Sequence, residues 1–280
     1  MNTIVPDDVL RRVHNLPSLP TAVMELLASL DQEDVRIDVL ALKIEKDQAL
    51  TAKTLRLANS SFYGMAHQVS TINEAITILG FRTVRSVATT AALIGTLPGN
   101  PLSSFKVTPF WRHAIATAVC AREMAGHLDI DPEYAYITGL LHDIGRLVLV
   151  TQFQPKYEAT MAYRAQHDCS LLEAEQAVLG IDHAAVGHEL VEHWKFPSAM
   201  VQAVSCHHAS TCVDLQPLSL VVIAANAIVH ALDLSMDEDD LVPHVPTGLW
   251  SQLGLNEKTL TDVLANTEKQ FSGASLVLSN

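Results

Sequence analysis

Apolar residues recur at helical spacing along most of the chain. In TAVMELLASL (21–30), for example, Val23, Leu26 and Leu30 fall on one stripe. Such a stripe is typical of an amphipathic helix that packs one face against a core. No segment of the sequence shows the sustained alternation of apolar and polar residues that a half-buried strand needs. The pattern therefore predicts an all-α fold.

Capping residues and glycines mark the ends of some of these helices. TINEAITILG opens with a capping box from Thr71 to Glu74 and closes at Gly80, which predicts a short helix between them. The other helical patterns cover residues 6–14, 38–46, 49–60, 81–94, 109–128, 133–150, 155–167, 170–179, 183–193, 197–208 and 218–232, with two more near 246–253 and 256–271.

Two proline-bearing stretches interrupt the helical pattern. NLPSLPT (15–21) is typical of an extended connector, and the prolines and glycine of TLPGNPLSSF (96–105) indicate a linker. The second stretch is the candidate boundary between two parts. We expect an N-terminal helical bundle, residues 1–100, packed on a C-terminal helical domain, residues 101–280.

Charge and cysteine usage limit the partners of the protein. The formal net charge is −13, from 18 Lys and Arg against 31 Asp and Glu, which argues against broad binding to nucleic acid or to an anionic membrane. The four cysteines form no CxxC pair, the N-terminus lacks the pattern of a signal peptide, and no uncharged run resembles a membrane span. We expect a cytoplasmic protein without a direct nucleic-acid or membrane partner.

One apolar segment contains two adjacent ionisable residues. In GLLHDIGRLVLV (139–150), His142 and Asp143 interrupt a run that is otherwise suited to burial. Buried ionisable groups are costly unless they are paired or bound to a metal. Groups from elsewhere in the chain must therefore compensate this pair.

Four further histidines lie on other predicted helices, which could pack side by side around this pair: His113, His183, His207 and His208. Imidazole nitrogens together with a carboxylate suit iron, manganese, zinc or cobalt, whereas magnesium and calcium prefer oxygen ligands. A single histidine is more often a core or surface residue than a ligand, and His-Asp and His-His pairs also occur by chance. Spacing alone leaves both interpretations open.

Three other histidines in the same region, His188, His193 and His230, have no partner that the sequence reveals. We expect structural roles for them.

The ordered set of His113, His142-Asp143, His183 and His207-His208 resembles the metal-ligand series of the HD superfamily of metal-dependent phosphohydrolases. It is similar above all to the HD-GYP branch, which hydrolyses cyclic di-GMP. The surrounding sequence resembles the HDOD family, a related family of bacterial signalling proteins whose members mostly lack a complete catalytic set. The matching strings, which span about residues 12–230, are LPSLPTAVMELL (16–27), LRLANSSFYG (55–64), INEAITILGFRTVRSVA (72–88) and HAAVGHELVEHWKFPSAMVQAVSCHH (183–208).

The resemblance implies an HD-type C-terminal domain with one or two bound transition-metal ions. The implied ion is iron first, with manganese or zinc as alternatives. Asp143 would bridge two ions, and Asp143 and Arg146 occupy the catalytic positions. The implied ligand positions are His113, His142, Asp143, His183, His207, His208 and Asn226.

The chain departs from the active relatives at three places. Asn226 in VVIAANAIVH stands where the superfamily has its last ligand Asp, and a neutral amide should hold a second ion more loosely. Arg146 stands where active relatives have Lys; it can clamp a phosphate but does not release a proton near neutral pH. The Gly-Tyr-Pro loop is missing, because ASTCVDLQP follows His208.

Two functions remain in view. The first is a signalling or regulatory module of HDOD type, with a largely retained metal site and protein partners. The second is an active metal-dependent phosphohydrolase, or phosphodiesterase, that acts on a phosphate-containing small molecule such as a nucleotide or cyclic dinucleotide. The sequence leaves the oligomeric state open.

Overall fold

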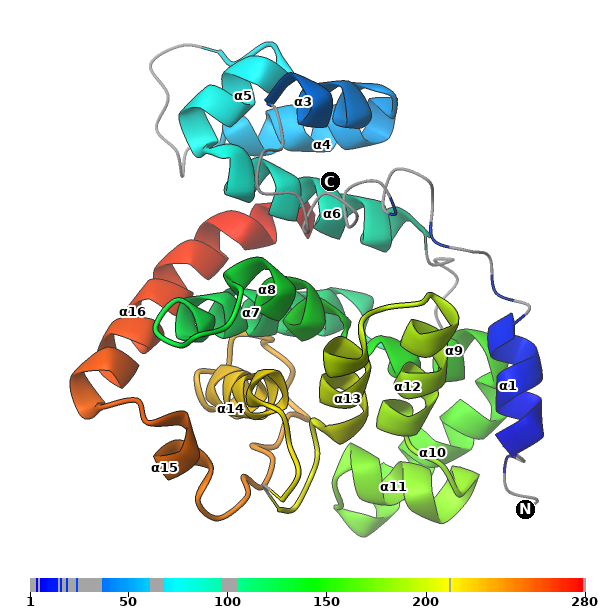
Figure 1. Ribbon diagram of the computed structural model, residues 1–280. Coiled ribbons are helices and arrows are strands. Elements are labelled where there is room, and N and C mark those ends of the chain that lie inside the picture. The colour runs from blue at the N-terminus through cyan, green and yellow to red at the C-terminus, as the bar shows by residue number, and fades with distance from the viewer. Residues whose placement is uncertain are drawn as a thin grey trace. The chain divides into compact units, whose positions relative to one another are not determined.

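The computed structural model of the protein describes residues 4, 6–14, 16, 19, 24, 37–60, 68–96, 105–211 and 213–278. Within these ranges every regular element is a helix and no strand occurs, which confirms the predicted all-α fold. Figure 1 shows the helices and their labels. The predicted helix 21–30 and the stretches 15–21 and 96–105 lie, apart from single residues, outside the described part of the chain.

The chain folds into two compact units. The first comprises residues 1–18 and 98–264, and the second comprises residues 19–97 and 265–280. The helices of the first unit are α1 (Pro6–His14), α7 (Val107–Ala125), α8 (Pro132–Leu141), α9 (Ile144–Gln152), α10 (Gln154–His167), α11 (Leu171–Leu179), α12 (His183–His193), α13 (Ser198–Cys206), α14 (Pro217–Ala231) and α15 (Leu249–Leu253). The helices of the second unit are α3 (Ile37–Glu45), α4 (Gln48–Ala58), α5 (Ile72–Leu79), α6 (Phe81–Thr96) and the short 3-10 helix η1 (Ser275–Leu278). The chain passes from one unit to the other within α16 (Glu257–Ala274).

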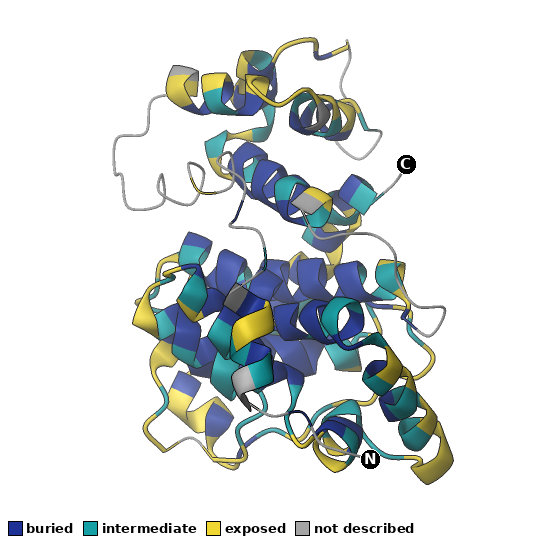
Figure 2. Ribbon diagram, turned by 90° about the vertical axis from the view of Figure 1, so that its right-hand side faces the viewer, coloured by how far each residue is buried: buried dark blue, intermediate teal, exposed yellow. Residues whose placement is uncertain are grey.

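Helices α7 and α14 form the centre of the first unit. Both are apolar on nearly all sides, so both are buried almost along their whole length and pack against each other. Helix α8 lies beside α7, and α13 lies beside α14. Figure 2 shows the difference in burial between inner and outer helices: dark blue, for buried residues, runs along the inner helices, and yellow, for exposed residues, lies on the outer ones.

Most predicted helices agree with the structure to within three residues at each end. The prediction of one continuous helix over 133–150 is wrong, because the chain breaks between α8 and α9 at His142 and Asp143. The apolar pattern continues through this break, so the periodicity alone did not reveal it. The break places the two ionisable residues in a turn, where their side chains can meet groups from other helices.

The predicted Thr71 cap and the closing Gly80 of α5 are present, but the predicted capping box is not complete, because Glu74 accepts from Ser70 and not from Thr71. The side chain of Thr71 accepts the backbone N–H of Glu74 at 3.1 Å, and the carboxylate of Glu74 accepts the N–H of Ser70 at 2.9 Å. Gly80 ends the helix with a φ of 83°, a conformation that favours glycine.

Among the described helices, none combines the length and the apolar character needed to cross a membrane.

Candidate metal centre

The side chain of His142 forms a hydrogen bond within the turn between α8 and α9. Nδ1 of His142 donates a hydrogen bond to the carbonyl oxygen of Gly139 at 2.7 Å, which satisfies a carbonyl at the end of α8. Asp143 has φ −96° and ψ 8°, in a sparsely populated region where residues of functional sites are often found. Its side chain is therefore aimed by the backbone of the turn rather than by a helix.

Two glycines allow the neighbouring helices to come close to this turn. A Cβ atom on Gly145 would lie 2.0 Å from the carbonyl oxygen of His183 and 2.6 Å from the nitrogen of Gly187, so α9 and α12 touch through their backbones. A Cβ atom on Gly139 would lie 2.8 Å from the carbonyl oxygen of Thr117, so α8 and α7 do the same. These contacts bring Asp143 close to His183 at the start of α12.

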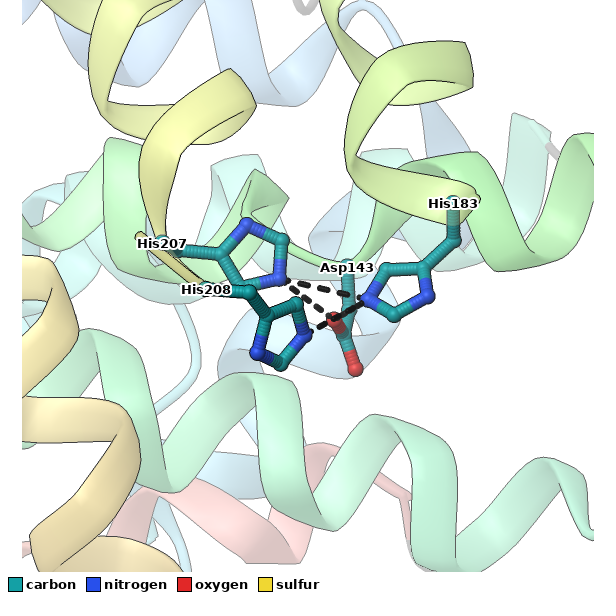
Figure 3. Close-up of side chains that lie close together, drawn as sticks. All are labelled: Asp143, His183, His207 and His208. Carbon is teal, nitrogen blue, oxygen red and sulfur yellow. Dashed lines mark hydrogen bonds and ion pairs between the residues drawn. The ribbon is translucent and has the colours of Figure 1, made fainter. Parts of the chain in front are cut away.

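Asp143 is the point at which the predicted residues meet. Its Oδ1 atom lies 3.2 Å from Nε2 of His183, 3.3 Å from Nε2 of His207 and 3.5 Å from Nε2 of His142. Nε2 of His183 also lies 3.0 Å from Nε2 of His208 and 3.3 Å from Nε2 of His207. Figure 3 shows how the rings from α12 and from the end of α13 converge on the carboxylate.

His113, on α7, reaches this group through His142. The two Nε2 atoms lie 3.1 Å apart, and one ring nitrogen of each histidine lies within 4.8 Å of the carboxylate of Asp143. The structure thus brings together six of the seven predicted ligand positions. Asn226 lies on α14, 1% exposed, with its Oδ1 atom buried and without a hydrogen-bond partner. Its place in a metal shell stays a prediction.

Outer hydrogen bonds orient the three most buried rings. Nδ1 of His207 donates to the carbonyl oxygen of Val204 at 2.7 Å, as Nδ1 of His142 does at Gly139. Nδ1 of His183 donates to Oε2 of Glu175 at 2.6 Å, and the same oxygen accepts the backbone N–H of His183. Because a neutral imidazole carries only one hydrogen, the bonds to Gly139 and Val204 leave Nε2 of His142 and Nε2 of His207 bare and facing Asp143.

The charges of the group follow from burial and from neighbouring charges. Burial lowers the pKa of His142 to about 4, although the charge of Asp143 opposes the shift. Burial acts in the same direction on His183, but the carboxylates of Glu175 and Asp143 outweigh it and raise the pKa of His183 to about 10. Burial would raise the pKa of Asp143, but His142 and His183 hold it well below its usual range. Asp143 is thus an anion surrounded by imidazoles.

Burial also lowers the pKa values of the two histidines at the edge of the group. His207 and His183 add to the effect on His208, and His230 and His142 add to the effect on His113. Both rings are therefore neutral near pH 7 and can offer a lone pair.

The donor set fits a transition-metal ion. Zinc, for example, binds nitrogen and oxygen at about 2.0–2.1 Å in a tetrahedron, which places its ligands about 3.3–3.4 Å from one another. The donor atoms of Asp143, His183, His207 and His208 are 3.0–3.3 Å apart where they meet. The Nε2 atoms of His183 and His207 face each other at 3.3 Å, so either the proton of His183 or a metal ion must lie between these two nitrogens.

Arg146 lies at the outer side of Asp143. Its Nη1 atom is 3.0 Å from Oδ2 of Asp143, its guanidinium lies over the ring of Phe110 at 5.5 Å, and its side chain is 18% exposed. Burial would lower the pKa of Arg146, but Asp143 and Tyr157 outweigh it and raise the pKa. The arginine is therefore a fixed positive charge beside the centre.

Sequence reasoning missed three residues of this region. Glu175 is fully buried against His183, although it lies on α11, where its acidic neighbour Glu173 is exposed. His230, expected to be structural, has its ring centroid 4.4 Å from that of His113, and Asp240 lies 3.3 Å from His230. No spacing rule in the sequence links these residues to the histidine series.

The fold and the site define a helical protein of the HD type. The HDOD domain model matches residues 16–210, and the chain belongs to the HDOD family, which confirms the resemblance read from the sequence. A crystal structure from Shewanella amazonensis SB2B, named "Putative phosphohydrolase", is 28% identical to this chain. It has a TM-score of 0.74 and covers 97% of this chain and 98% of its own.

Curated proteins also match parts of the chain. An uncharacterized protein of Treponema pallidum (strain Nichols) is 25% identical over 228 residues, which are 79% of this chain and 44% of that protein. Ribonuclease Y of Clostridium perfringens (strain SM101 / Type A) is 30% identical over 118 residues, which are 42% of this chain and 17% of that protein. The chain spans less than half the length of either relative.

Proposed function

We propose that this HDOD protein is a regulatory module whose core contains a buried transition-metal centre, and that it does not turn over a phosphodiester substrate. The observation that carries the proposal is the burial of the donor set. His142 is 0% exposed, His183 and His207 are each 2% exposed, and Asp143 is 6% exposed. Little of the surface of Asp143 is therefore open to a substrate phosphate.

The cavities described in the structure lie away from this centre. One, of about 770 Å³, is bordered by Leu55, Arg56 and their neighbours, and a second, of about 230 Å³, is bordered by Arg164 and Asp168. Neither cavity is lined by a residue of the histidine group.

The ion would be held by Asp143, His183, His207 and His208, whose donor atoms lie within 4.8 Å of one another. A bound transition metal would supply a positive charge to these lone pairs, and where water can enter it would supply Lewis-acid chemistry. The protein contributes the orientation of the rings, through Glu175 and Val204, and the exclusion of solvent. Occupancy would then set the stability of α9, α12 and α13, and with it the surface offered to partner proteins in signalling.

A second candidate function, phosphodiester hydrolysis, is favoured by one observation. Arg146 is partly exposed and already held beside Asp143, so its guanidinium could bind the phosphate of a nucleotide or a cyclic dinucleotide. Two differences from the active relatives argue against hydrolysis. Asn226 in place of Asp should weaken the binding of a second ion, and the missing Gly-Tyr-Pro loop after His208 should weaken the recognition of cyclic di-GMP.

Metal analysis combined with a turnover assay decides between the two functions. We expect the purified protein to carry iron, manganese or zinc in stoichiometric amount, and Asp143→Asn to bind at least one equivalent less. The matched control is His167→Gln, which changes an exposed histidine of α10. We expect no cleavage of bis(p-nitrophenyl) phosphate, of a cyclic dinucleotide or of RNA. Cleavage that disappears in Asp143→Asn but not in His167→Gln would establish the hydrolase instead.

A further inference from the structure

His113 on α7 also belongs to a second group of side chains that could bind a metal ion. His230 follows Asn226 by one turn of α14, and Asp240 lies in the loop after that helix. One donor atom from each of His113, His230 and Asp240 lies within 4.8 Å of the others. All three belong to the first compact unit.

His230 and Asp240 approach each other without forming an aligned hydrogen bond. Nδ1 of His230 is buried and lies 3.3 Å from Oδ2 of Asp240, an ion-pair contact that does not meet the geometry of an aligned hydrogen bond. Two ligands of one tetrahedral ion that binds at about 2.0–2.1 Å are separated by about 3.3 Å, with their lone pairs directed at the ion and not at each other. Ser235 donates a hydrogen bond to the same carboxylate oxygen at 2.5 Å, which holds the carboxylate in place.

The hydrogen bonds of the neighbouring ring leave a nitrogen of His113 free. Because the carbonyl of Gly139 only accepts, the hydrogen of His142 is on Nδ1 and its Nε2 atom is bare. The 3.1 Å contact between the Nε2 atoms of His113 and His142 is then a hydrogen bond only if His113 donates it. A neutral His113 that donates from Nε2 has a bare Nδ1, and this Nδ1 is buried without a partner.

The geometry points to a second site, and we propose that His113, His230 and Asp240 bind a divalent transition-metal ion separately from the centre around Asp143. Two imidazoles and one carboxylate match the ligand types that zinc, iron and manganese accept. The side chain of His230 is 14% exposed and that of Asp240 23% exposed, so an ion can reach this site from solvent more easily than it can reach Asp143. His113 would then serve this site through Nδ1 and orient His142 through its Nε2–H.

The proposal does not depend on the regulatory function proposed above, and zinc binding separates the two sites. The metal-stripped full chain is titrated with Zn²⁺ alone, and bound zinc is counted by calorimetry and by elemental analysis. We expect Asp143→Asn to retain one zinc equivalent. We expect His230→Gln and Asp240→Asn each to weaken that equivalent by at least ten-fold, while a second, tighter equivalent remains in both variants. The His167→Gln variant should bind as the wild type does.

Each outcome has a defined meaning. If His230→Gln and Asp240→Asn bind zinc as the wild type does, the second site is overturned and the His230–Asp240 contact is an ordinary ion pair. If Asp143→Asn binds as the wild type does while His230→Gln loses an equivalent, the second site stands and the centre around Asp143 fails. Asp240→Asn is nearly isosteric at a partly exposed position, and circular dichroism of each variant verifies that it is folded. Anomalous scattering at the zinc edge from crystals of Asp143→Asn should show an ion between His113 and Asp240, and density elsewhere would contradict the assignment.

Discussion

The two compact units bury polar groups of different kinds. In the first unit the buried set includes imidazoles and carboxylates, with His142, Asp143 and Glu175 among the most enclosed. In the described residues of the second unit the buried polar side chains are Thr54, Arg85, Ser86, Thr89, Thr90 and Thr267.

Buried hydroxyls and buried imidazoles differ in how their polar atoms find hydrogen-bond partners. A hydroxyl can bond within its own helix, as Thr54 does to the carbonyl oxygen of Leu50 at 2.8 Å. Facing imidazole nitrogens such as those of His183 and His207 have no partner within their own helices and need a proton or a metal ion between them. The comparison teaches that the stability of the first unit should depend on an ion, and that of the second should not.

The largest effect should come from a methyl group placed where two helices touch. Gly145→Ala directs a Cβ atom onto the backbone of His183 and Gly187, which cannot yield as a side chain would, so we expect a loss of about 3 kcal/mol or more in the free energy of unfolding. The same change should abolish metal binding at the centre around Asp143 by separating Asp143 from His183. Urea denaturation and elemental analysis measure the two effects.

Gly95→Ala is the matched control in the second unit. Gly95 is exposed on α6, and its added Cβ atom meets nothing within 4 Å, so this variant should be more stable by about 0.5–1 kcal/mol. If Gly145→Ala and Gly95→Ala change the free energy of unfolding equally, the close contact of α9 and α12 is not required for stability.

Removal of the metal should act on one unit alone. With an ion present at about 100 times its dissociation constant, its removal by a chelator costs about 2.7 kcal/mol of stability. Hydrogen exchange followed by mass spectrometry should show faster exchange in α12 and α13 and unchanged exchange in α4 and α6. Uniform loss of protection in both units would contradict the proposed division of roles.

A smaller effect should follow when the hydrogen bond between His183 and Glu175 is weakened. Glu175→Gln replaces the carboxylate that orients the ring and makes it more basic, so we expect metal affinity to fall by about 10- to 100-fold. Glu173→Gln, on the same helix, removes an exposed carboxylate that caps the helix with Ser170. Calorimetric metal titration should find no change in affinity for Glu173→Gln, and an equal loss in both variants would mean that only the stability of α11 matters.

The smallest effect should come from Asn226→Asp. A carboxylate at this buried position adds a negative charge and a stronger oxygen ligand, so metal occupancy should rise, by less than about ten-fold in affinity. Elemental analysis after dialysis against limiting metal checks this result. Unchanged occupancy would show that Asn226 is not in the metal shell.

The sequence by itself determined the elements of this protein and its family. Helices such as α5 are encoded locally, because the apolar spacing and the caps at Thr71 and Gly80 act within one or two turns. The order of the histidines and the surrounding strings also identifies the HDOD family.

Only the tertiary structure decided where the helix pattern breaks and which groups meet there. Apolar residues recur at helical spacing on both sides of His142 and Asp143, so the helix break is not visible in the pattern, and it lies next to the close backbone contact of Gly145 with His183. Glu175 and His230 carry no local signal of their roles, because a buried partner is defined by the packing of helices far apart along the chain. Local periodicity reports which face of a helix is apolar, whereas the position of one helix against another is a property of the whole core.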